Sequence, residues 1–246
     1  MTKRLHRVKV PGARLRDGRL RLEGAELHYL RDVLRLRRGA RIEVFDGEGR
    51  SLVAELATIG AAGAELVLRE AAAKIRESTL ELTLAVAVAK AAKLDWVVEK
   101  ATELGVTRIV PFASERAVAA LERGGSRIDR WRRIAAAAAA QSGRIRCPEI
   151  LAARSFAQLM SLAASHDRAL LFSTTGGDAL ADARGAVGSI VVATGPEGGF
   201  SATEVAQARQ AGFSVATLGP RVLRAETAAI VAVALAQHRW GDLRPV

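Results

Sequence analysis

The fold of this chain is decided by the segment TGPEGGFS at residues 194–201, together with LGPRVLRAETA at residues 218–228. Each segment follows a short apolar run, at residues 189–193 and 214–218, that predicts a strand, and each leads into a helical pattern. Open α/β sheets bind ligands in the loops at the carboxyl ends of their strands. The two segments are therefore predicted to be ligand-binding loops.

The residues of these loops narrow the kind of ligand. Neither segment fits GxGxxG or GxxxxGK[ST], which argues against a dinucleotide fingerprint and a P-loop. Glycines allow the backbone to approach a ligand closely, because no Cβ intervenes. Ser201 and Glu204 have the spacing of a capping box, which predicts that a helix begins there and presents free backbone N–H groups.

Outward from these loops, apolar runs alternate with helical patterns. Residues 80–88 form a continuous apolar run, as in a strand that is buried on both faces. Alternation of strands with helices predicts an α/β fold with a mostly parallel sheet and helices on both faces. The further predicted strands are 108–111 and 169–172, and the predicted helices are 94–104, 128–141, 202–211 and 225–239.

The first 70 residues have a different pattern. Residues 41–45 alternate apolar and polar side chains before a turn at Asp46-Gly47, and residues 52–56 and 64–68 are candidate partner strands. Residues 26–36 fit a short helix. This pattern predicts a small β-barrel with one helix, separated from the rest of the chain by the charged segment KIRES at residues 74–78.

The formal net charge of +11 is concentrated near the N-terminus, where residues 1–41 contain 13 Lys/Arg and 4 Asp/Glu. A local excess of this size indicates a polyanionic partner such as nucleic acid. Aromatic residues make up 4% of the chain, which favours phosphate contacts and shape recognition over base stacking. Lys90, Lys93 and Lys100 are interpreted as a solvated helix face.

Composition also argues against several classes of function. Cys147 is the single cysteine and the four histidines are isolated, so neither a disulfide nor a metal site is expected. No apolar run is long enough to span a bilayer, and no leader segment is evident, so we expect a cytoplasmic protein without a membrane partner.

Taken in order, the motifs of the chain resemble the bacterial 16S ribosomal RNA uridine-N3-methyltransferase family of the SPOUT class. The most specific strings are the two glycine-containing segments quoted above. The resemblance covers almost the whole chain, through the further strings HYLRDVLR (28–35), VFDG (44–47), EKATELGV (99–106), SER (114–116) and QSGR (141–144).

The resemblance implies both fold and partners. Residues 1–72 would form a PUA-like RNA-binding β-barrel, and residues 73–246 a SPOUT methyltransferase domain with a C-terminal trefoil knot, which general topology rules would not suggest. The family is homodimeric, so helix 225–239 would be partly buried between subunits. The implied cofactor is S-adenosyl-L-methionine, and the implied substrate is N3 of a uridine in 16S ribosomal RNA, either free or in the small subunit.

The resemblance also implies roles for individual residues. Arg224 would stabilise the negative charge on the uracil oxygens, while Glu226 or Glu197 would orient Arg224 or accept the proton; the choice between the two stays open. RNA phosphates would be bound by Arg7, Arg31, Arg35 and Arg144. The cofactor would be held by Thr194, Gly195, Glu197, Gly198, Gly199, Leu218, Gly219, Leu223 and Thr227.

Two departures from the family pattern and two alternatives remain. The chain has Ala135–Ala140 where acidic residues are usual, and Ala225 where threonine is common. One alternative is a non-catalytic RNA-binding or ribosome-assembly factor, in which the glycine segments are ordinary turns. The other is a SPOUT methyltransferase that acts on another RNA. Binding of S-adenosylmethionine would separate the first alternative from both enzymes.

Overall fold

The computed structural model describes residues 5–15, 18–72, 77–87, 91–117, 124–175, 177 and 186–244. The chain divides into two compact units, one of residues 1–77 with 139–147 and one of residues 78–138 with 148–246. The predicted domain boundary at residues 72/73 adjoins residues 73–76, which lie outside the described part of the chain, so its position stays a prediction.

The first unit is built on a five-stranded sheet in the order β1-β3-β4-β5-β2. β1 pairs with β3 in parallel and the other ladders are antiparallel. Alternate residues such as Leu20, Leu22, Ile42 and Val44 point into one buried core. The described ladders leave β1 and β2 as edges, so the sheet forms a half-barrel. Its strands are β1 (His6–Lys9), β2 (Arg19–Leu22), β3 (Arg41–Phe45), β4 (Ser51–Ile59) and β5 (Ala64–Ala71).

The helix predicted over residues 26–36 is shorter and less regular than expected. After the 3-10 turn η1 (Gly12–Leu15), helix α1 (Gly24–His28) continues into the π-helical turn η2 (Tyr29–Val33). Arg35 then takes a φ of +52°, in the left-handed region, which ends the helical turn.

The second unit contains a six-stranded sheet in the order β11-β9-β10-β6-β7-β8, and its described ladders are parallel. The predicted parallel α/β sheet is therefore confirmed. Val88, at the end of the predicted strand 80–88, lies outside the described residues. The strands are β6 (Glu81–Ala87), β7 (Arg108–Phe112), β8 (Glu149–Ile150), β9 (Arg168–Phe172), β10 (Ser189–Thr194) and β11 (Ser214–Ala216).

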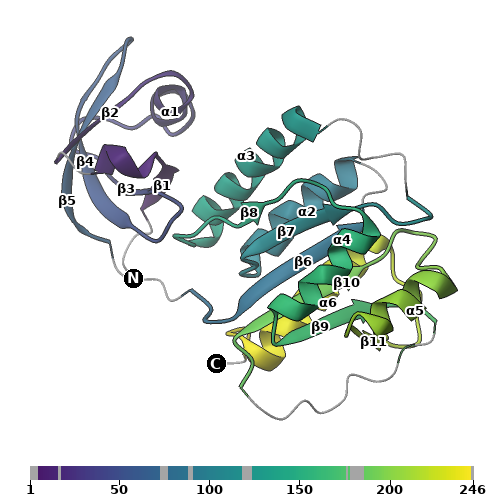
Figure 1. Ribbon diagram of the computed structural model, residues 1–246. Helices are drawn as coiled ribbons and strands as arrows, with labels where there is room; N and C mark the ends of the chain where they lie inside the picture. Colours follow the sequence, from purple (N-terminus) through teal and green to yellow (C-terminus); the bar gives the residue numbers. More distant parts are fainter. Residues whose placement is uncertain are drawn as a thin grey trace. The chain divides into compact units, whose positions relative to one another are not determined.

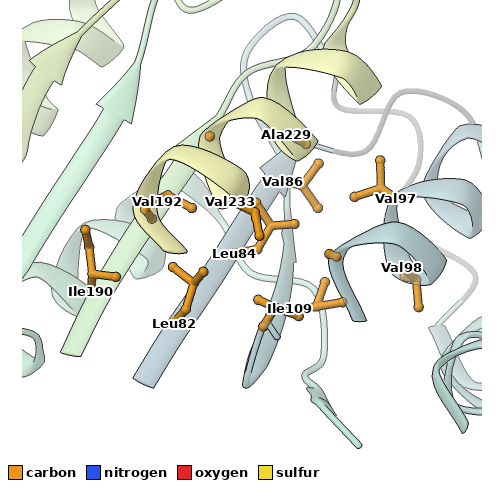
Figure 2. Close-up of a cluster of buried hydrophobic side chains, with 14 of the residues drawn as sticks. Leu82, Leu84, Val86, Val97, Val98, Ile109, Ile190, Val192, Ala229 and Val233 are labelled. Carbon is orange, nitrogen blue, oxygen red and sulfur yellow. The ribbon is translucent and has the colours of Figure 1, made fainter. Parts of the chain in front are cut away.

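Helices cover both faces of this sheet (Figure 1). One core joins Leu82, Leu84, Ile190 and Val192 to α2 (Ala91–Glu103), α3 (Gly124–Ser142) and α6 (Ala225–Trp240), and Figure 2 shows these side chains between the strands and the helices. The alternate strand residues pack on the other face against α4 (Phe156–Met160), the 3-10 turn η4 (Ser161–Ser165) and α5 (Ala202–Gln210). Burial on both faces explains why the strands are continuous apolar runs.

Helix α3 contributes to both units. Its residues up to Ala138 belong to the second unit, and Ala139–Ser142 belong to the first. The buried Arg7 of β1 donates hydrogen bonds to the carbonyls of Ala139 (3.0 Å) and Arg144 (2.9 Å), and pairs with Glu43 at 2.8 Å. The end of α3 is therefore an integral part of the half-barrel unit.

Candidate functional site

Three loops meet at the carboxyl ends of the adjacent strands β11, β9 and β10. They are residues 173–175 after β9, 195–200 after β10 and 217–224 after β11. A pocket lies among the first and third loops and the start of α6. It is lined by Phe172, Ser173, Thr174, Leu218, Gly219, Pro220, Arg221, Val222, Leu223 and Ala228. This is the place at which open α/β sheets bind ligands.

The loop after β10 packs so closely that side chains are excluded. A Cβ at Gly195 would lie 3.1 Å from the Phe200 ring, and one at Gly198 would lie 3.1 Å from Arg116 Cδ. Arg116, in the loop after β7, donates a hydrogen bond to the Gly198 carbonyl. Gly199 has a φ of +67°. Both the close contacts and the left-handed backbone require glycine here.

Gly219, in the third loop, differs from Gly195 and Gly198 because no atom packs closely against it. Gly219 has a φ of +94°, and a Cβ placed there would meet no atom within 4 Å. The backbone therefore faces open space at a position that lines the pocket.

The predicted capping box at the start of α5 is confirmed. Ser201 Oγ accepts from the Glu204 backbone N–H at 3.1 Å, and Glu204 accepts from the Ser201 backbone N–H at 2.9 Å. Glu204 is buried and also accepts from the Glu115 backbone N–H at 3.0 Å. This carboxylate therefore joins the end of the glycine loop to the loop after β7.

Replacing Ser201 with alanine is expected to lower the free energy of unfolding by about 1 kcal/mol, because the first turn of α5 loses a cap. Denaturant unfolding followed by circular dichroism measures this loss. Ser155→Ala is the matched control, since Ser155 forms the same capping box with Gln158 on α4. The two losses should be similar; unchanged stability in Ser201→Ala would mean that the cap does not form in solution.

A buried polar atom lies at the end of β10, beside the glycine loop. Thr194 is fully buried, and within the described residues its Oγ1 makes no hydrogen bond. A buried hydroxyl without a partner costs free energy. This unpaired hydroxyl lies directly before the glycine loop.

Lys93 of α2 brings two of the predicted catalytic residues together. Its Nζ lies 2.7 Å from Glu197 Oε1 and 3.1 Å from Glu226 Oε2. The hydrogen bond to Glu197 is the largest cause of a raised pKa of Lys93. The pKa of Glu226 is lowered, chiefly by its own backbone N–H and further by the Lys93 charge, against the opposing effect of burial. Of the lysines predicted to form a solvated helix face, Lys93 is 34% exposed but paired with carboxylates of two other segments, and Lys90 lies outside the described residues.

Arg224 occupies the N-cap position of α6, between the pocket-lining Leu223 and the helix. Its side chain makes no capping hydrogen bond and the residue is exposed. Its charge contributes to the lowered pKa of Glu226, which places the two side chains near each other. Arg224 is thus exposed to solvent and follows a pocket-lining residue directly in the chain.

The structure brings the predicted cofactor residues to one end of the sheet. Leu218, Gly219 and Leu223 line the pocket. The other six lie beside it, at the end of β10, in the loop that follows β10 and in the first turn of α6. Ser173 and Thr174 also line the pocket and were not predicted from the sequence. They could have been identified, because they directly follow the carboxyl end of the predicted strand 169–172.

The predicted phosphate-binding arginines fall into two groups. Arg7 and Arg144 are both buried, and Arg144 Nε donates to Glu77 at 3.0 Å. Such enclosed guanidiniums are not placed to bind a phosphate, so the expectation for these two does not fit their positions. Arg31 and Arg35 are exposed; Arg31 is held by Asp32 at 2.8 Å. The pKa of Asp32 is lowered to about 2, chiefly by its hydrogen bond with Arg31.

Two features are absent from the described residues. Within them, no group of three or more His, Cys, Asp or Glu side chains could hold a metal ion. No helix in the same residues has the length and apolar character needed to cross a membrane.

Comparison with known proteins gives two family matches. Residues 76–237 match the model described as an RNA methyltransferase domain, and residues 22–68 match an RNA methyltransferase PUA domain. Ribosomal RNA small subunit methyltransferase E of Synechocystis sp. is 34% identical over 234 residues, which cover 93% of this chain and 76% of that protein. The protein of the same name from Bacillus subtilis is 28% identical, with 91% of each chain covered.

Solved structures agree with these matches. The ribosomal RNA small subunit methyltransferase E of Neisseria gonorrhoeae, bound to S-adenosyl methionine, has a TM-score of 0.89 and 34% identity, covering 98% of this chain and 100% of that one. A proposed methyltransferase of Legionella pneumophila, in complex with the same cofactor, has a TM-score of 0.90 and 29% identity, with the same coverage.

Proposed function

Because the chain belongs to the RNA methyltransferase family that carries an N-terminal PUA domain, we propose that it methylates N3 of a uridine in small-subunit ribosomal RNA. The chain is an S-adenosylmethionine-dependent enzyme of this family. The observation that carries the proposal is the convergence of three loops at the carboxyl ends of β9, β10 and β11, in a fold that two cofactor-bound structures share.

The residues present fit S-adenosylmethionine. The backbone at Gly195, Gly198 and Gly199 lies in a loop from which side chains are excluded, and Gly219 faces open space in the pocket. Thr194 supplies a buried hydroxyl that needs a partner. We assign cofactor binding to these residues with Glu197, Leu218, Leu223 and Thr227, and add Ser173 and Thr174 from the pocket lining.

When bound, the cofactor supplies a methyl group on a positively charged sulfur. The side chains of this protein must orient the uracil ring and remove the proton from N3. Arg224 donates a charge-assisted hydrogen bond to a uracil oxygen, where negative charge develops. The proton acceptor is Glu197 or Glu226. The lowered pKa of Glu226 makes it a weaker base than a free carboxylate.

RNA binding is assigned to the first unit, which contains the PUA match. Of the four arginines predicted for this role, we keep the exposed Arg31 and Arg35 as phosphate contacts. Arg7 and Arg144 instead stabilise the half-barrel around the end of α3. A PUA domain of residues 1–72, acting with a catalytic domain of residues 73–246 in the cytoplasm, completes the proposal.

The knot and the homodimer belong to the same proposal. After β11, at one edge of the sheet, the chain returns to place α6 over β10 and β6. We propose that this C-terminal segment forms the trefoil knot that the family resemblance implies. Large apolar side chains are exposed on three neighbouring segments of the second unit: Trp96 (43%), Val222 (82%) and Leu235 (42%). A second copy of the chain would cover them, since exposed apolar patches mark interaction sites.

Methyl transfer to ribosomal subunits tests the proposed function. Labelled S-adenosylmethionine is incubated with the protein and with small subunits from a strain that lacks it, and the RNA is digested to nucleosides. We expect label in N3-methyluridine. Subunits from the parent strain are the matched control and should accept little label, because their target is already methylated.

Two results would change the conclusion. Label in a different nucleoside would retain the methyltransferase activity and overturn the assignment of uridine N3. RNA binding without any binding of S-adenosylmethionine would instead support a non-catalytic assembly factor.

A further inference from the structure

Lys93 lies at a position of α2 where the helix itself does not favour a positive charge. It is in the first turn of α2, and that turn contains no acidic residue. The N-terminal end of a helix carries partial positive charge, so a lysine there is disfavoured. Its position must therefore be stabilised by partners outside α2.

Those partners come from the two segments that follow β10 and β11. Glu197 lies within the glycine loop, and Glu226 is two residues beyond Arg224 in the first turn of α6. One ammonium group thus bridges both cofactor-binding segments from a third element. Lys93 is not itself among the residues that line the pocket, and we assign it no contact with the substrate.

The bridge is needed most by Glu226. Its side chain is 17% exposed, and within the described residues its Oε2 is inaccessible to solvent and has Lys93 Nζ as its ion-pair partner at 3.1 Å. Without the ammonium group of Lys93, the largely buried carboxylate of Glu226 would lose this ion-pair partner. A buried charge that loses its partner is strongly destabilised. Movement of the glycine loop away from the start of α6 would expose the Glu226 carboxylate to water and so reduce this destabilisation.

We propose that Lys93 is a positioning residue, which holds the 195–199 loop against the start of α6 and so sets the affinity of the site for S-adenosylmethionine. This inference rests on the proposed function and extends it to a residue outside the assigned site. The raised pKa of Lys93 keeps the ammonium charged at neutral pH, as the bridge requires.

Equilibrium binding of S-adenosylmethionine, measured by calorimetry, and steady-state methyl transfer to small subunits test this role. Lys93→Met is expected to raise the Kd and the cofactor KM by roughly tenfold or more, within the usual range of coupling between sites, and to change kcat by a smaller factor. Lys93→Arg, which keeps the charge, should restore most of the affinity.

Lys100→Met is the matched control. Lys100 lies on the same helix with similar exposure, and pairs with two carboxylates, Glu99 at 2.7 Å and Glu103 at 2.9 Å. Both partners are on α2 itself, so this variant should keep wild-type affinity.

Glu197→Gln provides a second route if Lys93→Met does not fold. Glu197 is exposed, so its replacement should leave the fold intact. This variant should also raise the Kd, and Lys93→Met should have a smaller effect in its background than in wild type. Additive effects, or a loss of kcat with normal Kd in Lys93→Met, would overturn the inference. Absence of binding by the wild-type protein would instead overturn the proposed function.

Discussion

Replacing Arg224 with alanine is expected to lower kcat by roughly 100- to 1,000-fold, the usual cost of losing one donor that stabilises developing charge. The Kd for S-adenosylmethionine should stay within about threefold of wild type, because the interaction is made to the substrate in the transition state. Arg224 is exposed at the N-cap of α6 and makes no capping hydrogen bond, so the helix should form without its side chain. Single-turnover methyl transfer and calorimetry measure the two quantities separately.

A suitable control is Arg132→Ala. Arg132 is exposed on α3, and its ion pair with Asp129 lies within that helix. This variant should keep normal kcat and Kd. If Arg224→Ala lost cofactor binding to the same extent as turnover, Arg224 would be a cofactor residue and not the group that stabilises the uracil.

The second large effect is expected at Gly219. Its φ of +94° lies outside the region that residues with a Cβ adopt without strain, so Gly219→Ala should lose roughly 1–2 kcal/mol of stability. Because residue 219 lines the pocket, any backbone movement that relieves the strain also changes the pocket wall. We expect the Kd for S-adenosylmethionine to rise at least roughly tenfold, equal to about 1.4 kcal/mol.

Gly212→Ala separates strain from binding. Gly212 has a φ of +96°, almost the same as Gly219, but it follows α5 and does not line the pocket. The two variants should lose similar stability in thermal unfolding, and affinity should fall in Gly219→Ala alone. Equal losses of affinity would show that residue 219 acts through global stability.

Long apolar runs made most of the second unit predictable from sequence. Strands such as β6 and β10 are buried on both faces, and their composition therefore reports their position directly. β1 and β2 were missed because each has four residues, in a region where arginine dominates; β1 (HRVK) contains a single apolar residue, and β2 (RLRL) alternates over two pairs only. The two-residue β8 pairs only with its neighbour β7 in the described sheet, and such a short strand leaves no pattern.

The parts of the site that depend on local backbone patterns could be predicted from the sequence. The parts formed by side chains that are distant in the chain could not. Glycines beside strand ends predicted the loops after β10 and β11, and the capping box at Ser201 is a local pattern that the structure confirms. Lys93 could not be identified, because both of its partners lie far away in the chain. The burial of Arg7 could not be predicted either, because its carbonyl partners on α3 and after it lie 132 and 137 residues away in the chain.

The shared helix α3 also affects the order in which the protein can fold during synthesis. Domains usually fold as they leave the ribosome, from the N-terminus onward. Here the guanidinium of Arg7 needs the carbonyls of Ala139 and Arg144, which are made long after β5. A nascent chain that ends at Glu77 therefore holds an incomplete half-barrel, in which Arg7 lacks these carbonyl partners. The N-terminal unit therefore completes its fold only after residue 147 has emerged, when part of the second unit has already been made.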